Sequence, residues 1–320
     1  MWRAALINLL FSARRFFPAA VSQDTGENQN ALTGVHVYQS VPMRDRLRLR
    51  TPTGIASLDP VLDGGVPPGS VVLLLGEPGA GSIEFVETSI IRLSTLKRNG
   101  AGGEHLLLPD GISYVTLTRM REDVLKDMAL SFNPESYNHL AEEIVFHDLS
   151  ELYFDASIVP PDWYGEGSVI ERLQKKQRKE NSDILAELAR VLGGCPDNSL
   201  LVMDSLTDIA PPLTEGARWH AFIALLRGLQ RVSKRWKTTI YLLLTSGILD
   251  RSRELEIVDC VDATIHFRWE ETGAQRRQRV MYFEKFQGVM PYLEDKNLVK
   301  FAVRVSAAGG FEVQNIRVVV

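Results

Sequence analysis

One stretch of the chain, residues 70–83, constrains the fold more than any other. An apolar strand at 71–75 runs into a glycine-rich loop, and a helical pattern of apolar residues begins near Ile83. Gly76 and Gly81 are separated by four residues, which is the glycine spacing of a phosphate-binding P-loop. The stretch therefore predicts a buried strand that turns sharply into a helix.

The two positions after Gly81 decide what this loop can do chemically. In a P-loop they hold a Lys, which meets the β- and γ-phosphates, and a Ser or Thr, whose hydroxyl binds Mg²⁺. Here they hold Ser82 and Ile83. Each lost charge-assisted contact is worth roughly 1.5–3 kcal/mol, so losing two weakens phosphate binding by about 10²–10⁴-fold. The glycine backbone and the helix N-terminus can still hold an anion.

We therefore expect weak or no nucleotide binding, with ATP and Mg²⁺ as the ligand class that such a loop would take. Glu77 and Glu84 place further negative charge beside the loop. Arg92 and Lys97 are alternative cations, but helical spacing directs them toward solvent. The candidate nucleotide-binding residues of the loop are Gly76, Glu77, Pro78, Gly79, Ala80, Gly81, Ser82 and Ile83.

The order of apolar segments predicts an α/β fold. Strand-like runs alternate with helical patterns, as in a parallel sheet covered by helices on both faces, and the last part of the chain predicts an antiparallel extension of one edge. The expected strands are 71–75, 112–117, 143–147, 199–204 and 238–245, and the expected helices are 83–97, 121–130, 168–192 and 215–237. The C-terminal runs are 261–268, 279–286, 298–305 and 311–319.

The N-terminal part of the chain has a different character. Residues 1–22 carry arginines but no acid, and residues 23–35 are polar, so we interpret 1–43 as a flexible extension or a mis-assigned start. Residues 44–320 are expected to form a single domain. Within it, residues 44–50 predict a short edge strand. Thr53 or Ser57 is expected to cap a short helix that ends at the pair Gly64 and Gly65.

Composition argues against several classes of function. The net charge of −4 provides no global attraction for nucleic acid, so DNA binding is a less favoured alternative. Two cysteines, Cys195 and Cys260, and six scattered histidines give no metal-ligand spacing, and we expect core thiols in a reducing cytoplasm. The sequence contains no run of 18 apolar residues, so we expect no membrane-spanning helix.

Several segments outside the glycine loop match one known family pattern. Residues 53–59 (Thr-Gly-Ile-Ala-Ser-Leu-Asp) and 64–70 (Gly-Gly-Val-Pro-Pro-Gly-Ser) lead into the loop. Residues 114–117 (Tyr-Val-Thr-Leu), 200–207 (Leu-Leu-Val-Met-Asp-Ser-Leu-Thr), 284–288 (Glu-Lys-Phe-Gln-Gly) and 310–313 (Gly-Phe-Glu-Val) follow in order. From about residue 51 to 319 the chain resembles the KaiC-like branch of the RecA superfamily. The resemblance implies a RecA-like P-loop fold with a mostly parallel central sheet, helices on both faces and a C-terminal antiparallel β extension.

The departures from that family pattern bear on function. The resemblance implies that Asp204 stands at the Walker B position and that Lys285 lies in a hairpin that reaches a neighbouring subunit's nucleotide. Thr118 and Arg119 stand where the family has the glutamates that polarise the attacking water, and Gln287 replaces a second cation of the hairpin. We therefore predict no catalytic residue. The pattern most resembles an archaeal group of inactivated RecA-superfamily ATPases implicated in signal transduction.

Side-chain partners can also be predicted at this site. We expect the carboxylate of Asp204 to be hydrogen-bonded to Ser205 or to loop amides, because Ile83 offers no metal ligand opposite it. We expect Arg119 to pair with Glu122 or Asp123 on the helix that follows it. No metal site is predicted.

The leading hypothesis is a catalytically degraded RecA-like protein that regulates or signals by binding other proteins, in a homo- or hetero-oligomer. Trp163 and Tyr164 form an exposed aromatic pair suited to a partner contact. Three alternatives remain: a weak or conditional ATPase completed by Lys285 of a neighbouring subunit, a DNA-repair or recombination mediator, and an RNA-modification scaffold similar to the Elongator hexamer.

Overall fold

The computed structural model describes residues 48–103, 105–131, 136–155, 157–164, 183–214, 216–272 and 276–315. The prediction of a flexible extension at 1–43 lies outside these residues, as do 44–47 of the expected edge strand and most of the helix expected at 168–192.

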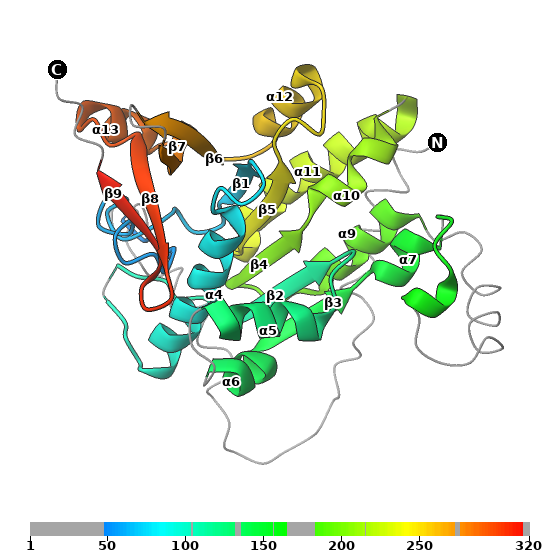
Figure 1. Cartoon of the computed structure of the whole chain (residues 1–320), viewed down its shortest axis with the longest axis horizontal. Coiled ribbons are helices and arrows are strands. Elements are labelled where there is room, and N and C mark those ends of the chain that lie inside the picture. The colour runs from blue at the N-terminus through cyan, green and yellow to red at the C-terminus, as the bar shows by residue number, and fades with distance from the viewer. Residues whose placement is uncertain are drawn as a thin grey trace, which may run out of the picture.

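A nine-stranded sheet forms the centre of the molecule, with strand order β3-β2-β4-β5-β1-β6-β7-β8-β9 (Figure 1). The strands from β3 to β6 are parallel, and those from β6 to β9 pair antiparallel. The predicted mostly parallel sheet with an antiparallel extension is therefore confirmed. The strands are β1 (Val71–Gly76), β2 (Gly111–Thr116), β3 (Ile144–Asp148), β4 (Ser199–Asp204), β5 (Thr239–Thr245), β6 (Ala263–Thr272), β7 (Arg276–Phe286), β8 (Lys300–Ser306) and β9 (Gly310–Asn315).

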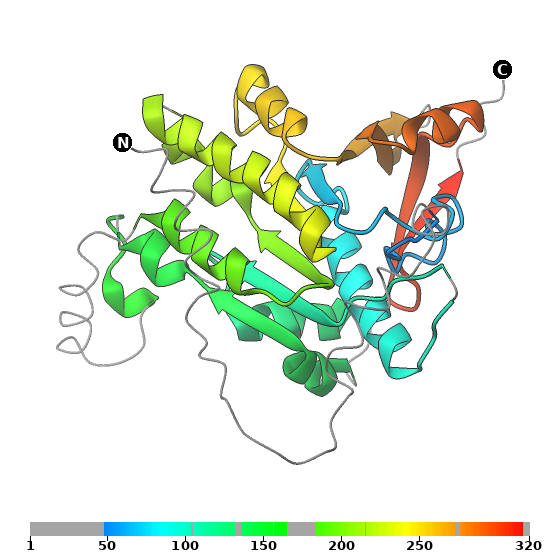
Figure 2. The ribbon, with the colours of Figure 1, turned by 180° about the vertical axis from the view of Figure 1, so that it is seen from behind.

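Helices cover both faces of the sheet and create two cores. One core contains residues of α4, α5 and α6, which lie in front of the sheet in Figure 1. The other contains residues of α9, α10, α11 and α12, and α11 crosses the sheet in the reverse view of Figure 2. The helices are α4 (Ser82–Arg98), α5 (Arg121–Ser131), α6 (Ser136–Glu143), α7 (Ser150–Phe154), α9 (Ile184–Gly194), α10 (Leu206–Ile209), α11 (Gly216–Trp236), α12 (Arg251–Asp259) and α13 (Met290–Asp295), with 3₁₀ turns η1 (Pro161–Trp163) and η2 (Pro211–Leu213).

Alternation along β1 explains how one strand supplies both cores. Val72 and Leu74 belong to the core under α4, whereas Leu73 and Leu75 belong to the core under α11. Successive side chains of a strand point to opposite faces, so an unbroken apolar run is what a strand covered on both faces requires.

One expectation near the N-terminal end of the described chain is wrong. The short helix expected before the glycine pair at 64–65 is a series of turns. Asp59 organises them, because its carboxylate accepts hydrogen bonds from the Thr53 amide and hydroxyl, both at 2.7 Å, and from the Gly54 amide at 3.1 Å. Of the edge strand expected at 44–50, the structure describes residues 48–50, where Arg50 forms an isolated bridge with Leu106.

The exposure of the aromatic pair Trp163 and Tyr164 and the burial of the two cysteines agree only in part with expectation. Trp163 is 78% exposed, as expected. Tyr164 instead lies half-buried, and its hydroxyl donates to Asp155 at 3.1 Å. Cys260 is a core thiol, whereas Cys195 is only half-buried, so the expectation of two core thiols holds for one of them.

Phe85 lies where α4, the sheet and the C-terminal strands meet. Its ring makes edge contacts with Tyr241, Phe267 and Phe311 at centroid distances of 5.7, 5.7 and 5.4 Å. The side chain is fully buried. These contacts connect β5, β6 and β9 to the helix that follows the glycine loop.

Phe85→Ala should therefore lower the free energy of unfolding by about 3–5 kcal/mol, since it removes a buried ring and leaves a cavity. Denaturant unfolding measures the change. Met120→Ala is the matched control, because Met120 is 62% exposed, and it should shift stability by no more than about 0.5 kcal/mol. If Phe85→Ala lowered the free energy of unfolding as little as the control does, Phe85 would not have the central packing role described here.

Candidate functional site

The glycine loop joins the carboxyl end of β1 to α4. Gly79 and Gly81 have φ angles of 71° and 118°, a region that other residues rarely adopt. A Cβ placed on Gly81 would lie 3.0 Å from the Phe311 ring, and one on Gly76 would lie 2.7 Å from the Ser82 hydroxyl oxygen. The loop glycines are therefore required by backbone conformation and packing, independently of any phosphate.

The loop is tied to β6 and β7 by hydrogen bonds from residues far along the sequence. The backbone amide of Trp269 donates to the Glu77 carboxylate at 3.0 Å, and its indole N–H donates to the Pro78 carbonyl at 3.2 Å. Arg279 donates from Nε to the Gly79 carbonyl at 2.8 Å, and its guanidinium lies 4.7 Å from the Trp269 ring centroid. Glu77, which was expected to repel a phosphate, thus also serves as an internal hydrogen-bond acceptor.

Sequence reasoning missed Trp269 and Arg279. Both lie about 190–200 positions from the residues they bind, as their separations of 191 and 200 show. Ser82 and Ile83 open α4 and are half-buried, and Ala80 is fully buried. Arg92 and Lys97 are exposed, as helical spacing predicted.

Asp204 ends β4, which β5 separates from β1 in the sheet. It is 7% exposed, and its Oδ2 accepts a hydrogen bond from the Tyr114 hydroxyl at 2.6 Å. The guanidinium of Arg119 lies 3.5 Å from the same oxygen. The expected bond to Ser205 is wrong, because the Ser205 hydroxyl donates to Asp208 at 2.9 Å.

Arg119 stands between two acids. Besides Asp204, it binds the Asp127 carboxylate at 2.5 Å, rather than the Glu122 or Asp123 expected from the sequence. Asp127 lies two turns into α5, which brings its side chain back over the loop that carries Arg119. Burial lowers the pKa of Arg119, but Tyr114, Asp204 and Asp127 outweigh this effect and raise it.

Glu87 is a buried carboxyl group that the sequence reasoning did not single out. It lies on α4 and is 4% exposed. Burial raises its pKa to about 8, Arg119 partly offsets this, and the carboxylates of Glu84, Asp127 and Asp204 raise it further. Glu87 is therefore largely protonated at neutral pH, and Arg119 is the cation that lowers its pKa against the effect of these three acids.

Lys285 lies on β7, next to the end of α12. Its ammonium donates to the Val258 carbonyl at 2.9 Å and to the Asp259 carbonyl at 3.2 Å. Cations complement the exposed carbonyls at a helix C-terminus. Within this chain Lys285 thus caps α12, and its reach to a neighbouring subunit stays a prediction.

Metal ligands and membrane spans are considered for the residues that the structure describes. In these ranges no group of three or more His, Cys, Asp or Glu side chains is arranged to hold a metal ion. Likewise, none of the helices described has the length and apolar character needed to cross a membrane.

Comparisons with known proteins identify the fold. No family model matches the chain. Among solved structures, a KaiC-like protein of Pyrococcus horikoshii OT3 aligns with a TM-score of 0.51 and 19% identity, over 83% of this chain and 99% of that chain. The chain has a RecA-like fold. Two relatives, each described as DNA repair protein RadA and from two strains of Mycobacterium tuberculosis, are 40% identical over 72 residues, which span 22% of this chain but only 14% of theirs.

The burial of Glu87 generates a pH prediction. Above pH 4.5 the unfolded chain releases a proton that the folded chain keeps until about pH 8. The contribution of Glu87 to the free energy of unfolding is therefore most favourable below pH 4.5. Between about pH 5 and 8 this contribution falls by up to about 1.4 kcal/mol per pH unit.

Glu87→Gln should remove this part of the pH dependence, as measured by the difference in unfolding free energy between the variant and the wild type across that range. The stability of the variant relative to the wild type should increase as pH rises. Glu122→Gln, which removes a carboxyl group from the exposed side of α5, is the matched control. An unchanged pH slope in Glu87→Gln would show that Glu87 is not protonated in the folded chain.

Proposed function

We propose that this chain is a RecA-like protein that does not hydrolyse nucleotide and acts as a regulatory or signalling module through protein partners. The observation that carries the proposal is the engagement of Asp204 by Tyr114 and Arg119. A Walker B carboxylate takes part in Mg²⁺ binding by facing the ion or a water bound to it. In this chain the guanidinium of Arg119 lies beside the Asp204 carboxylate and neutralises its charge.

The residues at the P-loop position support the same conclusion. Ser82 supplies no cation for the β- and γ-phosphates, and Ile83 supplies no hydroxyl for Mg²⁺. Phosphoryl transfer depends on positioning and charge neutralisation, so both losses act directly on the reaction. This set of side chains does not fit Mg²⁺-ATP.

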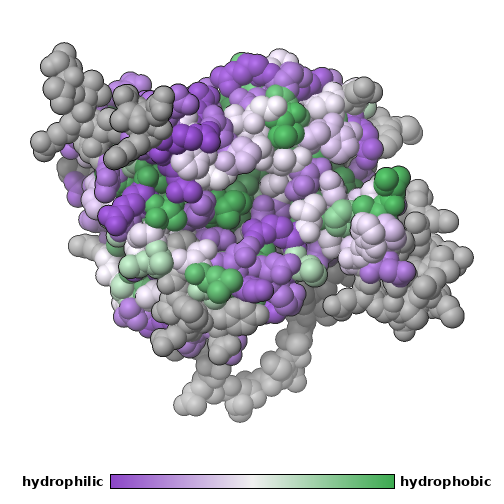
Figure 3. Space-filling model, in the orientation of Figure 1, coloured by the Kyte–Doolittle hydropathy of each residue, from purple (hydrophilic) through white to green (hydrophobic). Residues whose placement is uncertain are grey.

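The face of the molecule in Figure 3 is mostly hydrophilic, and its hydrophobic residues form small separate groups. A partner that binds this face would therefore meet a mainly polar surface. Elsewhere in the described chain, Ile158 and Trp163 are 101% and 78% exposed on one short segment. Aromatic side chains of this kind often anchor protein interfaces. Partners that dock on this segment would satisfy the regulatory proposal.

Calorimetry with ATP and Mg²⁺ tests the proposal. The wild type should show no Mg²⁺-dependent binding at micromolar concentration. Ser82→Lys with Ile83→Thr should raise the affinity for ATP by about tenfold or more, because it restores a charge-assisted contact. Mg²⁺ should add little in this double variant, since Arg119 still holds Asp204.

Adding Arg119→Gln to the double variant should produce Mg²⁺-dependent binding, because Asp204 is then free to face the metal. Arg121→Gln is the matched control, since Arg121 pairs with Glu122 instead. Micromolar Mg²⁺-dependent binding by the wild type would contradict the proposal. No gain in the double variant would mean that the loop does not admit a phosphate.

A DNA-repair role is the second candidate, and the RadA relatives favour it. Their name describes proteins of which the match spans 14%, so the role is carried over only as a proposal. Binding to single-stranded DNA should then weaken steeply as salt rises, because phosphate contacts release counterions. A mobility-shift assay at low salt with no shift would count against this candidate.

A further inference from the structure

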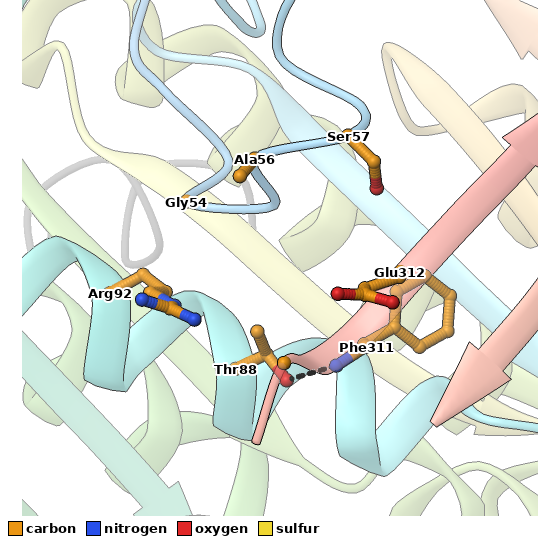
Figure 4. Close-up of a pocket in the computed structure, with 8 residues that line it drawn as sticks. Gly54, Ala56, Ser57, Thr88, Arg92, Phe311 and Glu312 are labelled. Atoms are coloured by element: carbon orange, nitrogen blue, oxygen red, sulfur yellow. Dashed lines mark hydrogen bonds between the residues drawn. The ribbon is translucent and has the colours of Figure 1, made fainter. Parts of the chain in front are cut away.

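A cavity of about 300 Å³ lies beside α4, past the first turn that follows the glycine loop (Figure 4). Three segments from distant parts of the chain form its walls: the turns at 54–57, the middle of α4 and the start of β9. Its volume is at the lower end of the range for small-molecule sites. The lining residues are Gly54, Ala56, Ser57, Thr88, Arg92, Gly309, Phe311 and Glu312.

Hydrogen bonds between the walls hold the cavity open. The Ser57 hydroxyl accepts from the Val313 amide at 2.8 Å, which ties the first wall to β9. The Thr88 hydroxyl accepts from the Phe311 amide at 2.9 Å, which ties α4 to the same strand, as the dashed line in Figure 4 shows. The site is therefore built by the fold before any ligand arrives.

Close packing also joins the turns at 54–57 to α4. Gly54 has a φ of 78°, and a Cβ at this position would lie 3.0 Å from the Ser89 carbonyl oxygen. The turn can approach α4 this closely only because the residue is glycine.

Two opposite charges line the cavity from different walls. Arg92 extends from α4, and Glu312 extends from β9 with its carboxylate turned toward the space between them (Figure 4). Within the part of the chain that the structure describes, neither side chain is recorded in an ion pair. Arg304, which pairs with Glu312 in the β8–β9 register, does not line the cavity.

We propose that this cavity binds a small zwitterion, such as a free amino acid, with its carboxylate on Arg92 and its ammonium on Glu312. A simple anion would satisfy Arg92 but would be repelled by Glu312, and a simple cation would face the reverse problem. A molecule with both charges satisfies both walls at once. The small volume excludes large ligands in favour of this class.

The ligand would act next to the glycine loop without touching it. Phe311 lines the cavity and also packs against Gly81, where a Cβ would lie 3.0 Å from its ring. A small molecule on Arg92 and Glu312 would therefore brace α4 against β9 beside the loop. This inference does not depend on whether the loop binds nucleotide.

Titration with a series of ω-amino acids of increasing length, followed by NMR or calorimetry without nucleotide, tests the proposal. One spacing between ammonium and carboxylate should bind best, and acetate and methylamine should bind more weakly. Arg92→Gln and Glu312→Gln should each weaken the best zwitterion by about tenfold or more, the value of a charge-assisted hydrogen bond. In Glu312→Gln the preference for the zwitterion over acetate should disappear.

Two further variants separate charge from shape. Arg304→Gln removes a neighbouring cation that does not line the cavity, and it should leave affinity unchanged. Ala56→Trp fills the cavity with both charges kept, and it should abolish binding while thermal unfolding confirms that the protein is folded. The proposal is overturned if no member of the series binds, if acetate binds as tightly as the best zwitterion, or if Arg92→Gln and Glu312→Gln bind like the wild type.

Discussion

β1 is hydrogen-bonded to β5 on one edge and to β6 on the other, and its side chains are buried on both faces. Every polar group of its backbone must be satisfied within the sheet, which places β1 between two strands and under two layers of helices. The chain that leaves such a strand has little space in which to turn. Glycines ease the turn, because a Cβ on Gly81 would lie 3.0 Å from the Phe311 ring and one on Gly76 would lie 2.7 Å from the Ser82 hydroxyl oxygen.

The charged groups beside α4 illustrate how several acidic side chains are accommodated around one guanidinium. Arg119 interacts with Glu87, Asp127 and Asp204, and Tyr114 donates a hydrogen bond to Asp204. Burying a carboxylate without a partner is costly, so Glu87 keeps its proton while Asp204 and Asp127 share the guanidinium. Arg119 therefore pairs with two of these carboxylates, and the retained proton leaves Glu87 neutral beside them.

α4 connects the two sites discussed above. Its first turn follows the glycine loop, and farther along the buried Thr88 and the exposed Arg92 line the cavity. Phe311 contributes to both places, against Gly81 at the loop and in the lining of the cavity. The C-terminal strands therefore do more than extend the sheet: β6 and β7 bind the loop, and β9 closes the cavity.

The sequence by itself determined the strands and the helices α4, α5 and α11, because apolar runs and helical periodicity are local properties. It also determined that Ser82 and Ile83 follow the loop, which limits the chemistry available there. The short helices α6, α12 and α13 were not predicted, since few turns give a weak periodicity and neighbouring elements stabilise them.

Only the tertiary structure decided the partners of the charged groups. Arg119 and Asp204 are 85 positions apart, and Arg279 and Gly79 are 200 apart, so no local pattern links them. The raised pKa of Glu87 and the facing charges of Arg92 and Glu312 likewise depend on which segments pack together. Burial and distance set these energies, and both are properties of the folded chain.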